Sequence, residues 1–176
     1  MSRLVPPLRF GEGVQGRGFE VRSVMAAPLT FMMGKVAADL PGDLHYCRNH
    51  MWARAGADGA WRFGFTSYAL RLMQDVYFLD WSVNDGDAIA LKQQVGNIET
   101  SKAVSDLFAP IAGTLVAINA DVLKDPSKIN VDGYGQGWLF EMTGDASPTM
   151  DVQGYFDFLT ANWDQTQRIL KGQMGE

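Results

Sequence analysis

Short runs of apolar and aromatic residues recur along the central part of the chain, and residues that favour turns separate them. One pair of runs flanks Gly56-Ala-Asp-Gly59, which predicts a β-hairpin. Another run is rich in strand formers and precedes the tight-turn pair Asp85-Gly86. Many short strands with frequent turns indicate a small sandwich or barrel. The runs that predict strands lie at 44–55, 60–65, 76–81, 88–99, 106–119 and 137–142.

Two other segments have the spacing of amphipathic helices. The first is predicted over 67–73, with Thr66 or Ser67 as its N-cap. The second follows Ser147-Pro148, which places an N-cap before a proline at the first helical position. We expect this C-terminal helix to pack on the sheets and cover an edge, and docking of a partner is the alternative. Its apolar residues are Val152, Tyr155, Phe156, Leu159 and Trp163.

The first 43 residues differ from the rest of the chain. They contain four of the seven prolines and many glycines, without a sustained period. We interpret them as a partly irregular arm that lies against the domain. The predicted organisation is therefore an arm at 1–43, a β-rich domain at 44–145 and a helical extension at 146–176.

Composition excludes several classes of function. The chain has 176 residues and a formal net charge of -5, which opposes binding to nucleic acid because that binding depends on clustered Lys and Arg. No apolar run approaches the roughly 20 residues of a membrane helix, so no membrane partner is expected. A single cysteine, Cys47, permits no internal disulfide, and we expect the reduced cytoplasm as the location.

The most informative residue is Lys102, where two predicted strands meet. Its neighbours Ser101 and Ala103 are small, so the amine should stand exposed at the tip of a loop. Two carboxylates, Glu99 and Asp106, flank it on the two strands. A lysine in this position is typical of a covalent attachment point, and an ordinary surface lysine is the alternative interpretation.

The residues around Lys102 resemble the lipoylation motif of the glycine cleavage system H protein family. The motif reads Glu99-Thr-Ser-Lys102-Ala103, then Ser105-Asp106 and Ala109-Pro110-Ile-Ala-Gly113. The resemblance extends over roughly residues 44–160. Further residues that carry it are His50, Trp52, Gly64-Phe-Thr66 and Asp132-Gly-Tyr134-Gly-Gln-Gly-Trp138-Leu139.

The resemblance implies a mainly β, lipoyl-type barrel-sandwich of two antiparallel sheets, with a short internal helix and a C-terminal helix. Lys102 would carry lipoic acid in amide linkage, as part of a non-catalytic carrier subunit with a swinging dithiolane arm. A lipoate ligase or lipoyl transferase is then an expected partner, and Glu99, Ser101 and Asp106 would contribute to its recognition. Biotin carriers place a similar lysine between methionines, which are absent here. No metal site is expected.

Three positions depart from the family pattern. Met51 stands where a glutamate is usual, Leu72 where a histidine is frequent, and Gly133 where a proline is usual. These losses resemble the lipoate-binding proteins of heterodisulfide-reductase-like sulfur oxidation. The sequence therefore favours a carrier of sulfur intermediates that serves a heterodisulfide-reductase-like complex. The alternatives are a glycine cleavage H protein, which carries an aminomethyl group between glycine cleavage enzymes, and an unlipoylated binding module.

Overall fold

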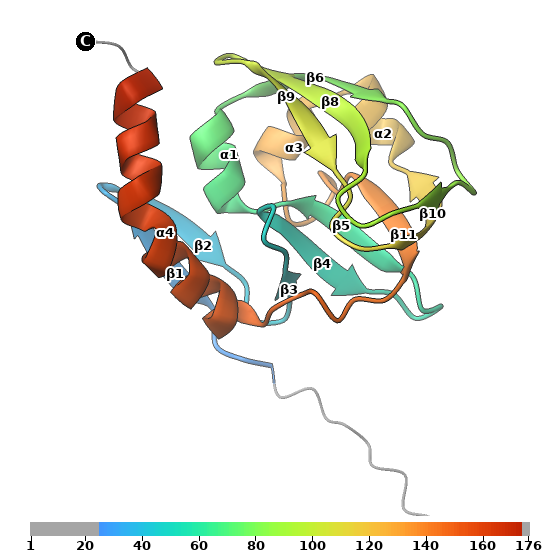
Figure 1. Ribbon diagram of the computed structural model, residues 1–176, viewed down its shortest axis with the longest axis horizontal. Helices are drawn as coiled ribbons and strands as arrows, with labels where there is room; N and C mark the ends of the chain where they lie inside the picture. The colour runs from blue at the N-terminus through green and yellow to red at the C-terminus, as the bar shows by residue number, and fades with distance from the viewer. Residues whose placement is uncertain (1–24, 174–176) are drawn as a thin grey trace, which may run out of the picture.

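The structure, a computed structural model, describes residues 25–173 of the chain. Nine of the strands in this part form two antiparallel sheets (Figure 1). The larger sheet has the order β3 (His45–Tyr46), β4 (Met51–Ala55), β5 (Trp61–Phe65), β11 (Phe140–Gly144), β10 (Gly113–Ile118) and β7 (Ala88–Ile89). The smaller sheet has the order β6 (Val76–Trp81), β8 (Gln94–Thr100) and β9 (Val104–Phe108).

These two sheets enclose the main hydrophobic core. Apolar side chains from both sheets are buried in it, among them Phe63 and Phe140 from the larger sheet and Ile98 and Leu107 from the smaller one. Burial of apolar surface is the dominant favourable contribution to folding, so this core holds the sandwich together. The prediction of a mainly β, lipoyl-type sandwich is confirmed.

A third, smaller layer lies beside the sandwich. The hairpin of β1 (Leu29–Met33) and β2 (Val36–Leu40) packs with the long helix α4 (Val152–Gln173) on the side where α1 (Ser67–Met73) lies (Figure 1). A second hydrophobic cluster joins these elements. The sequence did not predict this hairpin, and residues 1–24 of the expected arm lie outside the described part.

The helices agree with the sequence except for the start of α4 and their number. Helix α1 begins as predicted, since the Thr66 hydroxyl accepts a hydrogen bond from the Ala69 amide. Helix α4 begins at Val152, and the expected N-cap at Ser147 is wrong. The Asp151 carboxylate accepts from the Gly154 amide at 2.7 Å and caps the helix instead. Two short helices were not predicted, α2 (Ala120–Lys124) and α3 (Ser127–Val131).

Three of the predicted strands are interrupted or shifted. The strand expected at 44–55 breaks before β4, where His50 has a φ of 64°. The run at 88–99 divides into β7 and β8, and the run at 106–119 divides into β9 and β10 around Pro110. Proline cannot donate a ladder hydrogen bond, which explains the break between β9 and β10.

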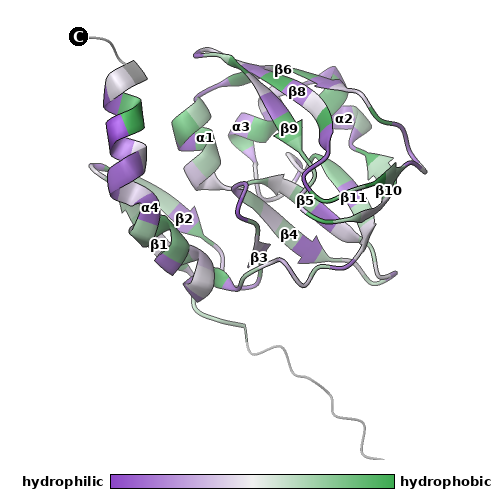
Figure 2. Cartoon of the chain, in the orientation of Figure 1, coloured by the Kyte–Doolittle hydropathy of each residue, from purple (hydrophilic) through white to green (hydrophobic). Residues whose placement is uncertain are grey.

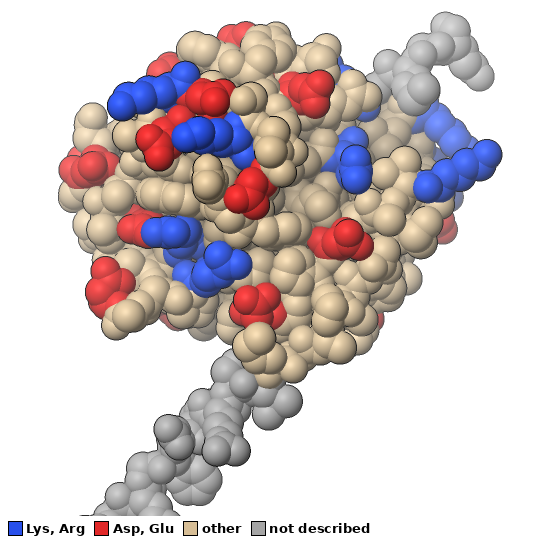
Figure 3. Space-filling model, turned by 180° about the vertical axis from the view of Figure 1, so that it is seen from behind, with Lys and Arg blue, Asp and Glu red and all other residues tan. Residues whose placement is uncertain are grey.

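The helices and one face of the described chain were compared with what a membrane span or a nucleic-acid site requires. Along α4, hydrophobic residues are interspersed with hydrophilic ones (Figure 2), and no helix between residues 25 and 173 is long and apolar enough to cross a membrane. Positive and negative side chains are intermixed on the face shown in Figure 3. Such mixing does not create the basic patch on which binding to phosphate backbones depends.

Candidate functional site

Lys102 lies in the turn that connects β8 to β9, and its side chain is exposed. The last paired residues of the hairpin are Glu99 and Val104. The described residues form two ion pairs, Arg62 with Glu141 and Lys128 with Asp121, and Lys102 is in neither. The amine is therefore accessible to a modifying enzyme.

The Thr100 side chain holds the backbone of this turn by hydrogen bonds. Its side chain is 5% exposed, and its hydroxyl accepts hydrogen bonds from the backbone amides of Lys102 and Ala103, each at 3.3 Å. The same hydroxyl donates to the carbonyl of Ala103 at 3.2 Å. Thr100 was not predicted as a site residue, although a hydroxyl two residues before the lysine is the signal of such a turn.

Contacts with the end of α1 hold the turn in place. The Lys102 Nζ donates to the Leu72 carbonyl at 3.4 Å. The Ser101 amide donates to the Asp75 carbonyl at 3.1 Å, and the Ser101 hydroxyl donates to Gln74 Oε1 at 3.3 Å. Cations are stabilised near the carbonyl end of a helix, so α1 favours the lysine where it lies.

The three residues expected to guide a ligase lie on different sides of the hairpin. Glu99 and Asp106 are two register positions apart on the paired strands, because Glu99 faces Val104 and Asp106 faces Asn97. Side chains two residues apart share one face of a strand, so both carboxylates lie on the same face of the hairpin. Ser101 is directed toward α1 instead.

A cleft of about 170 Å³ lies next to the hairpin, under the end of α1. Met51 and Leu72, which replace polar residues of the family pattern, both line it, together with His50 and Asp106. Asp106 is the one acidic residue of the lining, but its carboxylate lies on the outer face of the hairpin and accepts a hydrogen bond from Gln94 Nε2 at 2.8 Å. The structure thus places two of the three departures in one cleft, which is largely apolar.

The half-buried His50 ring also borders this cleft. Burial lowers its pKa from 6.5 to about 4, so the ring is neutral at pH 7. Its Nδ1 lies 2.9 Å from the Tyr155 hydroxyl, which also contacts the Thr66 hydroxyl at 3.2 Å. His50 therefore links α4 to the start of α1, and its charge plays no part near neutral pH.

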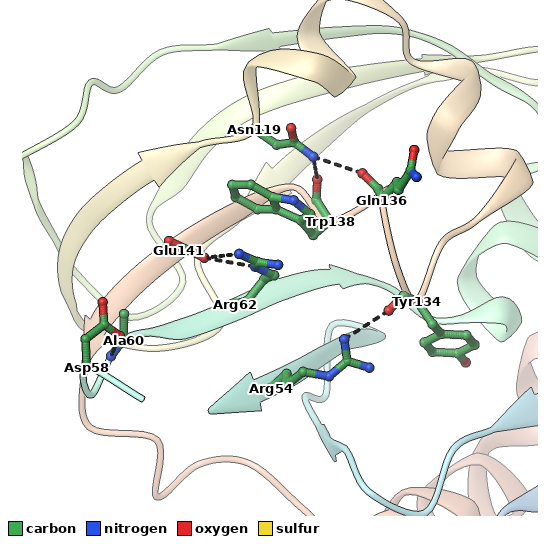
Figure 4. A network of polar contacts seen from close by, with 9 residues as sticks. All are labelled: Arg54, Asp58, Ala60, Arg62, Asn119, Tyr134, Gln136, Trp138 and Glu141. Atoms are coloured by element: carbon green, nitrogen blue, oxygen red, sulfur yellow. Dashed lines mark hydrogen bonds and ion pairs between the residues drawn. The ribbon is translucent and has the colours of Figure 1, made fainter. Parts of the chain in front are cut away.

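The segment 132–139 is held in place by hydrogen bonds to its backbone carbonyls (Figure 4). Asn119 Nδ2 donates to the carbonyls of Gln136 at 3.0 Å and Trp138 at 2.7 Å. Arg54 Nη1 donates to the Tyr134 carbonyl at 3.3 Å.

Close packing and a buried hydrogen bond explain why this segment needs particular residues. Trp52, which is fully buried, donates from Nε1 to the Gly133 carbonyl at 2.8 Å. A Cβ at Gly135 would lie 2.4 Å from a carboxylate oxygen of Asp132, so that position accepts only glycine without rearrangement. These residues of the motif therefore support the fold rather than carry chemistry.

Two further residues have ordinary structural settings. Cys47 is buried, and burial raises the pKa of its thiol to about 12, so it is not a reactive thiolate. His45 is exposed, and its ring packs edge-on against Trp61. Between residues 25 and 173 no group of three or more His, Cys, Asp or Glu side chains could hold a metal ion.

The arrangement fits a neutral chain attached to Lys102 through an amide. The lysine is exposed, its amine faces a carbonyl rather than a carboxylate, and the cleft beside the hairpin is largely apolar. Acylation removes the lysine charge but leaves one N–H on Nζ, so the hydrogen bond to the Leu72 carbonyl can persist. The site therefore suits a covalently attached acyl group better than a diffusible ligand.

Comparison with known proteins gives consistent matches. The sequence profile described as "Glycine cleavage H-protein" matches residues 44–153. The glycine cleavage system H protein of Mycobacterium bovis is 41% identical over 110 residues, which is 62% of this chain and 81% of that protein. The H protein of Psychrobacter cryohalolentis is 38% identical over 125 residues, which is 71% of this chain and 94% of that protein.

A solved structure agrees with the sequence matches. The crystal structure of a glycine cleavage system H protein from Mycobacterium marinum superimposes with a TM-score of 0.57 and 32% identity. It covers 66% of this chain and 95% of that chain. The hairpin β1–β2 and nearly all of α4 lie outside the profile match.

Proposed function

This chain belongs to the glycine cleavage H-protein family, and on that premise we propose that Lys102 carries lipoate in amide linkage. Proteins of this family are non-catalytic carriers with lipoate attached to a lysine. The observation that carries the proposal is the exposed amine of Lys102 at the β8–β9 turn. Lys102 also occupies the position of the attachment lysine in the sequence motif that resembles this family.

The residues around Lys102 have distinct roles in this function. Thr100 fixes the backbone of the turn, and the Leu72 carbonyl accepts from Nζ and so sets where the arm leaves the surface. When bound, lipoate supplies a dithiolane that carries groups, and this chemistry belongs to the cofactor. The tether raises the effective concentration of the carried group at any docked enzyme.

The partners supported best are the glycine cleavage enzymes and a lipoate ligase or lipoyl transferase. Profile, sequence and structure comparisons all match glycine cleavage H proteins, and they give no support to a heterodisulfide-reductase-like complex. We therefore propose that the main function is to carry an aminomethyl group, which was an alternative interpretation of the sequence.

One observation favours sulfur transfer as a second candidate. Met51 and Leu72 make the cleft largely apolar, and an amine buried there without a partner would be costly. A neutral sulfur cargo would not meet that cost. The two candidates share the fold and the lysine, and they differ in what the cleft must accept.

The attachment is tested by intact-mass analysis. Full-length protein incubated with lipoate, ATP and a lipoate ligase should gain one lipoyl group. Lys102→Arg, which keeps the charge, should gain none, whereas Lys124→Arg at an exposed lysine of α2 should gain one. Modification of the Lys102→Arg protein would show that another lysine carries the group.

The cargo is tested with the lipoylated protein. Offered to glycine decarboxylase and its aminomethyltransferase, it should support release of carbon dioxide from glycine, and the Lys102→Arg protein should not. A lipoylated protein without activity here would contradict the glycine cleavage role while leaving the carrier role intact. Sulfur transfer would then be the remaining candidate.

A further inference from the structure

A second cavity, of about 300 Å³, lies beside Lys102 and is lined partly by the lysine itself. One wall belongs to the additional layer, with Met33 and Val36 from the β1–β2 hairpin and Trp163 and Leu170 from α4. These four residues all lie outside residues 44–153, the part that the family profile matches. The volume is at the lower end of the range of roughly 300–1,000 Å³ for small-molecule sites.

We propose that this cavity is a resting site for the neutral, unloaded lipoyl arm on Lys102. The inference depends on the proposed function, because an unmodified lysine has no arm to place there. It adds a site that the family-matched part of the chain does not contain.

The amine of Lys102 lies beside the cavity. Lys102 Nζ donates to the carbonyl of Leu72, and Leu72 and Arg71 line the same cavity from the end of α1. An acylated Nζ keeps one N–H, which can make the same hydrogen bond. The attached chain therefore begins at the rim of this cavity. The smaller cleft of 170 Å³ does not include Lys102 in its lining.

The wall of the cavity matches the chemistry of a lipoyl arm. The arm is an aliphatic chain that ends in a disulfide-containing ring, and it is uncharged once the amide has formed. Five of the seven lining residues are apolar, and they include the Met33 thioether and the Trp163 indole. Burial of apolar surface favours such an occupant, and sulfur makes favourable contacts with aromatic rings.

Charge restricts the occupant to the neutral form of the arm. Arg71 is the one charged residue of the lining once Lys102 is acylated, and the lining contains no carboxylate. A cationic amine cargo would be repelled by the Arg71 guanidinium and would have no counter-ion. The cavity therefore suits the uncharged arm and not an arm loaded with a cationic amine.

The wall is held by packed aromatic side chains. The Trp163 ring lies edge-on to Phe31 of β1, with centroids 5.7 Å apart, and to Tyr68 of α1, with centroids 6.3 Å apart. Phe31 and Tyr68 are both buried. Because β1, α1 and α4 meet at this tryptophan, the cavity is formed before any arm enters it.

Methyl NMR on the full chain tests occupancy directly. The protein carries ¹³C-methyl methionine, and lipoylation is confirmed by intact mass before the spectra are compared. A failure to lipoylate would contradict the proposed function. The resting site is tested only on protein that is shown to be lipoylated. The Met33 resonance should shift on lipoylation, and that of Met142, buried in the main core, should not. An unshifted Met33, or a shift of Met51 in its place, would overturn the resting site.

Thiol accessibility gives an independent measurement. The lipoylated protein is reduced with a phosphine, and the alkylation rate of the arm is followed on the Lys102 peptide by mass spectrometry. Leu170→Asp should make alkylation faster by roughly five-fold, which corresponds to ~1 kcal/mol of lost binding. Ile169→Asp is the matched control, because Ile169 is 54% exposed and does not line the cavity.

A second variant guards against a local disturbance of α4. Val36→Asp lies at the start of β2 on a residue that is 45% exposed, and it should accelerate alkylation in the same way. Circular dichroism checks that each variant is folded. Equal rates in the wild type, Leu170→Asp and Val36→Asp would exclude the resting site.

Discussion

The amine nitrogen of Lys102 lies 3.4 Å from the carbonyl oxygen of Leu72, so the β8–β9 turn and the end of α1 meet at the attachment point. The backbone of Ser101 adds a second contact to Asp75, the second residue after the last residue of α1. The lysine is exposed, but the turn that presents it is held by two elements. A swinging arm built here has a rigid base.

Replacing Thr100 by valine should loosen that base. Valine keeps the shape but removes the acceptor for the amides of Lys102 and Ala103. We expect the free energy of unfolding to fall by about 1–2 kcal/mol, as for the loss of a buried hydrogen-bonding hydroxyl. The rate of lipoylation by the ligase should fall as well. Urea denaturation and intact-mass time courses measure the two effects.

The matched control for this turn is Thr100→Ser, which retains the hydroxyl. It should lipoylate at nearly the wild-type rate. If the valine and serine variants behaved alike, the hydroxyl would have no role in presenting the lysine.

Replacing Met51 by glutamate should improve aminomethyl carrying. Met51 is 1% exposed and borders the cleft of 170 Å³, so the new carboxylate would face the space that a cationic cargo needs. We expect faster glycine turnover with the lipoylated variant and a lower free energy of unfolding, because a buried carboxylate costs stability. Coupled decarboxylation assays and urea denaturation measure these changes.

Met51→Gln separates charge from shape. The glutamine variant should show little gain in turnover, since it supplies no counter-charge. An equal gain from both variants would mean that polarity alone, and not the carboxylate, limits the wild type.

His50 should make the fold less stable in mild acid. Burial lowers its pKa from 6.5 to about 4, so the unfolded chain binds the proton more tightly. The contribution of His50 is fully present above pH 6.5 and is lost as the pH falls toward 4. The full loss would reach about 3 kcal/mol, from a pKa difference of about 2.5 at 1.36 kcal/mol per unit.

The variant His50→Asn isolates this contribution from the other titrating groups. Asparagine tolerates the positive φ of this position and does not titrate. Urea denaturation at pH 7.5 and 4.5 should show a smaller stability difference for the variant than for the wild type. Equal differences would assign the acid sensitivity to other residues.

Gly64 should tolerate no side chain. A Cβ there would lie 2.6 Å from indole atoms of Trp52, which is fully buried and anchored to Gly133. Gly64→Ala should therefore lower the free energy of unfolding by about 1–3 kcal/mol, the usual cost of overpacking. Gly172→Ala in α4 meets nothing within 4 Å and should stabilise by up to about 1 kcal/mol. Thermal or urea denaturation compares the two, and a neutral Gly64→Ala would contradict the close packing.

Local signals explain what the sequence could predict. Helix α1 is announced by Thr66 as its N-cap, and the turn at Lys102 by small residues between two strand-like runs. In each case the determining residues lie within a few positions of one another. The sequence therefore predicted both the exposed turn and the short helix that supports it.

Contacts between distant segments explain what was missed. The β1–β2 hairpin is stabilised by Phe31 against Trp163, two residues 132 positions apart in the sequence. Its own strands are five residues each, too short to be distinctive. The cavity beside Lys102 was missed for the same reason, because its wall forms only when α4 packs on the hairpin. Helices α2 and α3 have five residues each and no sustained period.

The layer of β1, β2 and α4 also limits how a partner enzyme can approach Lys102. It rises on the side of α1, next to the lysine, where the family-matched part of the chain has nothing comparable (Figure 1). An enzyme that receives the arm must come from the opposite flank or have a recess that admits the helix. The flank is therefore a steric determinant of which enzymes can dock at the lysine.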